Sequence, residues 1–177
     1  MTDRRFGMTS EEQKHQRNIL RSYLSRYRRA KNRVNKLRRR REDFIEDMKY
    51  PLGAQSYSGL PRSSAPNDGA ATYVFRLCEI EERIIEQEKN ANSIMLQIMD
   101  IMDFLPEDSE SRCVMEMKYI DGQSEKQIMA VQYYSSRTTV AKYINAGLDE
   151  LLTYKKIQSI ISRYEKKMED INYEGSW

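Results

Sequence analysis

The sequence predicts an all-α fold, and three observations carry that prediction. Apolar residues recur at steps of three and four along most of the 177 residues, the spacing that places them on one face of a helix. The chain has only seven glycines and four prolines, and they gather in its middle part. A charged fraction of 32% and a mean hydropathy of −0.82 leave little material for a large globular core. We therefore expect an elongated protein built from long helices.

Residues 1–50 are predicted to form a long basic helix. From about Glu11 to Met48 the apolar positions alternate at steps of three and four, which is a heptad seam with Arg41 as its polar break. The seam consists of Leu20, Tyr23, Tyr27, Ala30, Val34, Leu37, Phe44 and Met48. At ~1.5 Å per residue the helix would be on the order of 55 Å long. It needs a partner helix to bury this seam.

The partner is expected in residues 70–105, which predict an acidic return helix. Its own apolar stripe consists of Leu77, Ile84, Ala91, Met95, Ile98 and Met102. The connecting segment, residues 51–69, is rich in Pro, Gly and Ser and predicts a loop. A flexible connector is favoured slightly over a docking loop. The apolar residues Tyr57 and Leu60 are the features that favour a docking loop. The whole predicts a long antiparallel, coiled-coil-like hairpin.

The basic run of the first helix has two interpretations. Twelve Arg or Lys and no acidic residue lie between Arg17 and Arg41. In a hairpin, Arg38 to Arg41 would face the glutamates of the return helix, so part of the run would hold the hairpin together. The remainder could contact phosphates, for which the candidates are Arg26, Arg28, Arg29 and Arg33. Both interpretations stay open.

Residues 106–152 predict a helix-turn-helix. Val114, Met117 and Ile120 are spaced to bury one stripe of a first helix, which Asp121-Gly122 would end because Gly accepts the left-handed conformation. Ser124 and Gln127 form a capping box that starts a short second helix. This helix would bury Ile128 together with Val131 or Gln132.

A third helix is expected to begin after Ser136, a good N-cap residue. Its predicted buried face consists of Val140, Tyr143 or Ile144, Gly147, Leu148 and Leu151, and Gly147 indicates a close helix contact. The outward residues are of the types that read DNA, since Arg binds guanine, Asn binds adenine and Lys binds phosphate. The candidate DNA-binding residues are Ser136, Arg137, Thr138, Ala141, Lys142 and Asn145, with Ser124 and Lys126 as further phosphate contacts. The alternative is an ordinary three-helix unit with a solvated polar face.

The motifs of this region also resemble a known family. From Arg112 the chain reads R-x-V-M-x-M-K-Y-I-D-G-x-S, then Q-I-M-A, then S-x-x-x-V, which resembles region four of bacterial sigma factors. With the basic helix, the loop and the acidic helix, roughly residues 15 to 152 resemble the RinA and ArpU type of phage transcriptional regulators. The resemblance implies a DNA-binding activator of prophage late genes in low-GC Gram-positive bacteria that acts with host RNA polymerase.

Two positions depart from the sigma-like pattern. If Ala130 is the usual small residue of the second helix, it comes one residue late, and the tight-turn position falls on Tyr133 or Tyr134. The register of the second helix is therefore open by one residue, whereas Ser136 and Val140 have the expected spacing.

Residues 153–177 predict a C-terminal amphipathic helix and tail. The apolar stripe consists of Ile157, Ile160, Ile161, Tyr164, Met168 and Ile171. A stripe of this kind must be buried, so it packs either on the hairpin or on a second subunit. We expect a homodimer, because paired helix-turn-helix units bind pseudo-palindromic half-sites.

Other functional classes find little support in the residues. The sole histidine is His15, Cys78 and Cys113 are the only cysteines, and no phosphate-binding glycine loop occurs. We expect no catalytic site, no metal and no cofactor, with both thiols reduced. No apolar run approaches the ~20 residues that cross a bilayer, so we expect a cytoplasmic protein of the bacterial host cell that does not contact membranes. Two other functions remain as alternatives, a phage small terminase subunit and a coiled-coil interaction protein. Activation and repression are not distinguished.

Overall fold

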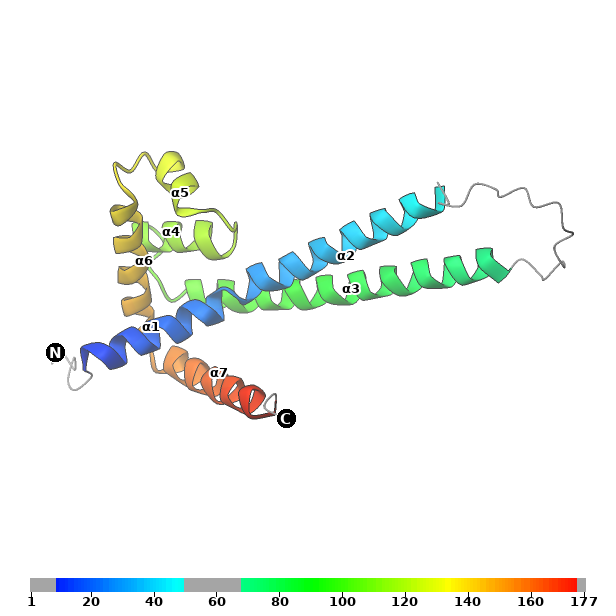
Figure 1. Cartoon of the computed structure of the whole chain (residues 1–177). Helices are drawn as coiled ribbons and strands as arrows, with labels where there is room; N and C mark the ends of the chain where they lie inside the picture. Colours follow the sequence, from blue (N-terminus) through cyan, green and yellow to red (C-terminus); the bar gives the residue numbers. More distant parts are fainter. Residues whose placement is uncertain (1–8, 50–67, 175–177) are drawn as a thin grey trace, which may run out of the picture. The chain divides into compact units, whose positions relative to one another are not determined.

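A computed structural model of the chain describes residues 9–49 and 68–174 (Figure 1). The all-α prediction is confirmed: the described residues form helices and no strand. The helices are α1 (Ser10–Leu24), α2 (Arg26–Lys49), α3 (Asp68–Met102), α4 (Glu110–Tyr119), α5 (Glu125–Val131), α6 (Arg137–Leu152) and α7 (Lys155–Glu174). None of these helices is both long and apolar enough to cross a membrane. Tyr57 and Leu60 of the predicted loop lie outside the described residues.

The first predicted helix is divided in two at Ser25. A capping box of Thr9 and Glu12 starts α1. At the other end, the amide and the hydroxyl of Ser25 both donate to the carbonyl oxygen of Arg21, at 3.0 and 2.7 Å. A serine that bonds to the preceding turn competes with the regular helical pattern, which accounts for the break. The expectation of one uninterrupted helix from about Glu11 to Met48 was therefore wrong.

The chain forms two compact units. The first unit consists of Met1–Arg28 with Ser93–Trp177, and the second unit consists of Arg29–Asn92. The unit boundaries fall inside α2 and α3, so each of these two helices contributes to both units.

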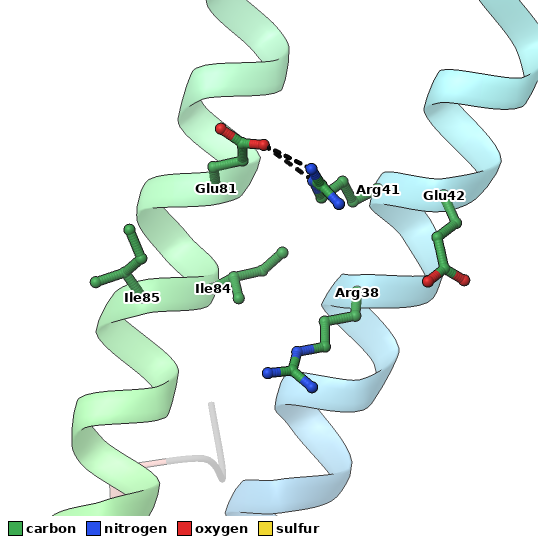
Figure 2. A pocket seen from close by; sticks show the side chains of 6 residues that line it. All are labelled: Arg38, Arg41, Glu42, Glu81, Ile84 and Ile85. Atoms are coloured by element: carbon green, nitrogen blue, oxygen red, sulfur yellow. Dashed lines mark hydrogen bonds and ion pairs between the residues drawn. The ribbon is translucent and has the colours of Figure 1, made fainter.

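The second unit pairs the segments of α2 and α3 in antiparallel order. Arg38 bonds to Glu88 at 2.6 Å, Arg41 bonds to Glu81 at 2.9 Å, and the Phe44 and Tyr73 rings stack at 4.9 Å between centroids. Figure 2 shows the Arg41 to Glu81 pair bridging the two helices, with Ile84 directed between them. An open hollow of about 300 Å³ lies there, lined by Arg38, Arg41, Glu42, Glu81, Ile84 and Ile85. The buried apolar residues of this unit are Ala30, Val34, Ile84 and Ala91.

The first unit has the larger core. In it α6 contacts α1, α4, α5 and α7. The largest fully buried side chains of this unit are Leu20, Leu24, Ile98, Met102, Met115, Ile128, Leu148, Leu151 and Ile157. The prediction of a close contact at Gly147 is confirmed, because a Cβ at this position would lie 2.3 Å from the Sδ of Met115 and 3.3 Å from the Cβ of Ser111.

The stripe of α7 packs on α1 and α6 of the same chain. Ile157 and Ile161 are buried, and the Tyr164 ring meets the Tyr23 ring edge-on at 5.2 Å between centroids. His15 of α1 also contacts Glu165, with 2.7 Å between Nε2 and Oε1. The sequence left the choice between the hairpin and a second subunit. The structure buries the first two turns of this stripe within the chain itself.

Candidate nucleic-acid interface

Helix α4 packs against α6, and its buried stripe differs from the predicted one. Val114, Met115 and Tyr119 are buried, whereas the expected Met117 and Ile120 are only half-buried. The close approach of α4 to α6 at Gly147 explains the difference, because it draws Met115 into the contact.

The turn between α4 and α5 follows the predicted chemistry. Gly122 has a φ of 74°, in the left-handed region that glycine adopts without strain. The amide of Gln123 donates to the carbonyl oxygen of Met117 at 2.9 Å, which satisfies one of the last carbonyl groups of α4. The turn therefore ends α4 where Asp121-Gly122 predicted a stop.

Helix α5 begins with the predicted capping box. The amide of Gln127 donates to Oγ of Ser124 at 3.3 Å, and the amide of Ser124 donates to Oε1 of Gln127 at 2.8 Å. Ile128 is buried, whereas Val131 is 52% exposed. Gln132 is half-buried instead, and its Nε2 donates to Sγ of Cys113 at 3.3 Å. Of the two residues left open by the sequence, Gln132 therefore faces the core.

The tight turn before α6 falls on Tyr133, which has a φ of 53° and a 94% exposed side chain. Tyr134 instead turns inward, where its hydroxyl donates to Glu110 and its ring lies 5.4 Å from that of Tyr143. Burial and the neighbouring Glu110 carboxylate raise the pKa of the Tyr134 hydroxyl. Of the two tyrosines that the sequence left open, Tyr133 therefore occupies the tight-turn position.

Helix α6 starts at the predicted residue and buries the predicted face. The hydroxyl of Ser136 accepts from the amide of Thr139 at 3.3 Å. The buried residues of α6 are Val140, Ile144, Gly147, Leu148 and Leu151, and Tyr143 is half-buried. Ile144 rather than Tyr143 therefore completes the core face.

The opposite face of α6 carries the candidate DNA-binding residues. Arg137, Thr138 and Lys142 are exposed, and Ala141 and Asn145 are half-buried. An open hollow of about 450 Å³ runs along this face, lined by Thr138, Ala141, Lys142, Asn145, Ala146 and Asp149. Ser136 is half-buried, with its hydroxyl engaged as the N-cap. The outer face therefore offers two cations, a hydroxyl and an amide beside small side chains.

Two arginines of α1 lie along the same face, and the sequence alone did not place them there. Arg21 donates through Nη2 to Oδ1 of Asn145. Arg17 forms a bidentate ion pair with the carboxylate of Asp149. The distance from Nη2 of Arg17 to Oδ2 of Asp149 is 2.6 Å. The sequence contains one indication of these contacts. Arg17 and Arg21 are four residues apart, as are Asn145 and Asp149, so each pair lies on one face of its helix.

A carboxylate sits among the cations of this interface. Nζ of Lys118 lies 2.5 Å from Oε1 of Glu125, and this hydrogen bond is the main cause that lowers the pKa of the Glu125 carboxyl. The charges of Arg137 and Arg21 lower it further. Glu125 therefore remains ionised and offsets part of the positive charge near the start of α6.

The other predicted phosphate contacts are distributed over both units. Ser124 and Lys126 lie exposed at the start of α5, although Ser124 is used as the N-cap. Arg26 lies over the Tyr23 ring, 4.6 Å from its centroid, and is half-buried. The remaining candidates are exposed: Arg28 in the first unit, and Arg29 and Arg33 in the second.

Two glutamates of α3, Glu81 and Glu88, contact the basic run. Each flanks the seam on the side of α3 that faces α2, which explains why they reach Arg41 and Arg38. The other glutamates of this stretch, Glu79, Glu82 and Glu86, are exposed. Part of the run therefore holds the hairpin, through Arg38 and Arg41, and contact of the other arginines with phosphates stays a prediction.

Within residues 9–49 and 68–174, no group of three or more His, Cys, Asp or Glu side chains could hold a metal ion. Cys78 is exposed and Cys113 is half-buried, and both are free thiols. Burial, followed by the charges of Glu110 and Glu116, raises the pKa of the Cys113 thiol.

No known protein family, curated protein or solved structure matches this chain.

Proposed function

We propose that this protein binds double-stranded DNA sequence-specifically, with α6 as its recognition helix. One observation carries the proposal: one face of α6 is buried in the core, whereas Arg137, Thr138 and Lys142 are exposed on the opposite face of its first turns. A helix held in this way has a fixed orientation, so the same side chains always point outward. The major groove is about 12 Å wide and admits an α-helix.

The exposed residues have complementary roles. The Arg137 guanidinium can donate two hydrogen bonds to O6 and N7 of guanine, and Thr138 offers a hydroxyl and a methyl group to base edges. Lys142, one turn further along, is a point charge for phosphate. Near the start of α5, Ser124 and Lys126 are exposed and are further candidates for phosphate contact.

The biological role within this proposal is transcriptional regulation, most specifically the activation of phage late genes together with host RNA polymerase. The support is the resemblance of residues 112–140 to sigma factor region four and of the longer chain to RinA and ArpU regulators. A second support is that α4, α5 and α6 follow one another in the element order of a helix-turn-helix, each with a capped N-terminus.

A homodimer remains part of the proposal, with a different contact surface. Ile157 and Ile161 are buried within the chain, so the first two turns of the α7 stripe are not free for a second subunit. Exposed apolar side chains on α3, namely Val74, Phe75 and Ile85, are the better candidates.

The test is selection from a randomised duplex library, followed by binding measurements at several salt concentrations. Arg137→Ala is expected to cost about 1 to 3 kcal/mol on the selected site while leaving binding to random duplex nearly unchanged. Lys142→Ala should weaken both and reduce the slope of log K against log salt by about one.

Matched controls come from exposed cations of α7. Arg163→Ala and Lys166→Ala remove the same two kinds of charge from a different helix and should leave the selected site's affinity unchanged. If Arg137→Ala and Lys142→Ala also bind like the wild type, α6 does not read DNA. If the wild type retains no duplex even at low salt, the interaction-protein alternative takes precedence.

A further inference from the structure

We infer that Arg21 of α1 is a positioning residue for DNA reading, because it holds Asn145 as a hydrogen-bond donor toward acceptor atoms of DNA. The inference rests on the proposed function and adds a second helix to the reading surface. Its DNA partner is an acceptor group, either the O6 and N7 edge of guanine or a phosphate oxygen.

The geometry places α1 beside the second half of the outer face of α6. Arg21 reaches Asn145, and Arg17, one turn earlier, reaches Asp149, one turn later. The two contacts follow one another in antiparallel order, so they define a side-by-side arrangement of the two helices rather than a single crossing point. Leu20 and Leu24 of α1 are fully buried, which fixes the side of α1 from which these arginines project.

The chemistry of the pair determines the orientation of the Asn145 amide. A guanidinium has only donor groups, so the atom that faces Arg21 must be Oδ1 of Asn145. The Nδ2 group is then the part of this amide that remains available, because within residues 9–49 and 68–174 no other residue bonds to it. An unrestrained Asn side chain binds adenine through one donor and one acceptor.

Together, Arg21 and Asn145 therefore present donor hydrogens. Guanine shows two acceptors in the major groove, and phosphate shows only acceptors, whereas the adenine edge requires an acceptor from the protein as well, and Arg21 already occupies one of the two lone pairs of Oδ1 of Asn145. This preference differs from the adenine contact that the residue type of Asn145 alone suggested. The Asn145 side chain borders the open hollow of α6, where such a partner could approach.

The neighbouring pair removes an electrostatic obstacle. Asp149 lines the same hollow with a 46% exposed side chain, and its carboxylate would repel DNA phosphates. Arg17 binds this carboxylate with two hydrogen bonds and neutralises it. Docking of α1 thus both orients Asn145 and reduces the negative charge on this end of the face.

The experiment compares base preferences and salt dependence for five proteins: the wild type, Arg21→Ala, Arg21→Lys, Asn145→Ala and the control Arg163→Ala. Each is tested against the selected duplex with every base pair changed in turn. At one base pair, Arg21→Ala and Asn145→Ala should each reduce discrimination in favour of guanine about 5- to 150-fold, the range for loss of one good base contact. Arg21→Lys keeps a donor for Oδ1 and should retain part of the discrimination.

A phosphate partner would give a different pattern that also supports the inference. Arg21→Ala and Asn145→Ala would then weaken binding to all duplexes alike and flatten the salt slope, with no change in base preference. Arg163→Ala, a matched control on α7, should change neither quantity. Thermal unfolding of each variant, followed by circular dichroism, identifies any loss of binding that is due to unfolding.

Three results would overturn the inference. If Arg21→Ala binds every duplex more tightly, α1 covers the reading face instead of contributing to it. If Arg21→Ala matches the folded wild type in base preference and salt slope, Asn145 is not positioned by Arg21. If the wild type itself binds no duplex, the proposed function fails together with the inference. In the other two cases the wild type binds DNA, so only the inference about Arg21 fails.

Discussion

The outer face of α6 and the outer face of α2 are both exposed and basic, but they are built differently. The α6 face has only two exposed cations in its first turns, Arg137 and Lys142, and it lies on a helix whose other side is buried. The α2 face has more exposed cations, including Arg33, Lys36 and Arg40, on a helix with few buried apolar residues behind it. Under the proposed function, it is the fixed orientation of the side chains, and not the number of charges, that marks the face that reads bases.

The physical reason is the amount of buried apolar surface behind each face. Discrimination between bases requires donors held at defined positions, and a well-packed core holds them there. The second unit buries few apolar residues, and part of its seam is occupied by Arg41 and its ion pair with Glu81. A surface of this kind suits contacts with phosphates, which require charge but little positional precision.

The largest expected effect tests the packing behind α6. Ile144→Ala should lower the free energy of unfolding by about 2 to 5 kcal/mol, because Ile144 is buried in the first unit and the deletion leaves a cavity. Ile84→Ala makes the same change in the seam of the second unit, where few other apolar residues are buried around it, and should cost less. Denaturant unfolding of both variants provides the measurement. Equal losses would contradict the difference in packing between the two faces.

A smaller effect is expected from the ion pairs of the second unit. The double variant Glu81→Lys, Glu88→Lys places two cations beside Arg41 and Arg38 and should lower stability by about 1 kcal/mol, since exposed pairs contribute only ~0.2–1 kcal/mol each. Thermal unfolding at low salt is the measurement, and the loss should diminish in high salt because screening weakens exposed charges.

The matched control for this variant changes the same net charge at exposed positions. Glu79→Lys, Glu86→Lys should alter the melting temperature less, because both side chains lie on the exposed side of α3. If the two double variants melt alike at every salt concentration, the ion pairs do not hold the hairpin, and Arg38 and Arg41 would be available to nucleic acid.

The smallest effect concerns the two thiols, one in each unit. Cys113 is half-buried, and the raised pKa of its thiol leaves less thiolate at pH 8, so it should react slowly with Ellman's reagent. Cys78 is exposed on α3 and should react first. The variants Cys78→Ser and Cys113→Ser assign the two phases. A fast phase that disappears in Cys113→Ser would show that the first unit is less tightly packed around α4 than the structure indicates.

The local features of the α4 to α6 region could be predicted from the sequence because their causes lie within a few residues. The capping box of Ser124 and Gln127, the left-handed Gly122 and the cap at Ser136 each satisfy backbone groups three to six residues away. The buried face of α6 followed from helical periodicity. Where two neighbouring residues were equally well spaced, as with Val131 and Gln132, periodicity alone could not distinguish them.

The arrangement around the outer face of α6 depends on residues that are distant in the chain. Arg21 and Asn145 are 124 residues apart, and Arg17 and Asp149 are 132 apart, so no local pattern pairs them. The continuous heptad seam predicted one long helix, yet Leu20 and Tyr23 are buried in the first unit and Ala30 and Val34 in the second. A seam specifies only that a face must be covered. Which helix covers it is settled by the packing of the whole chain, because apolar burial is non-directional and any complementary surface can provide it.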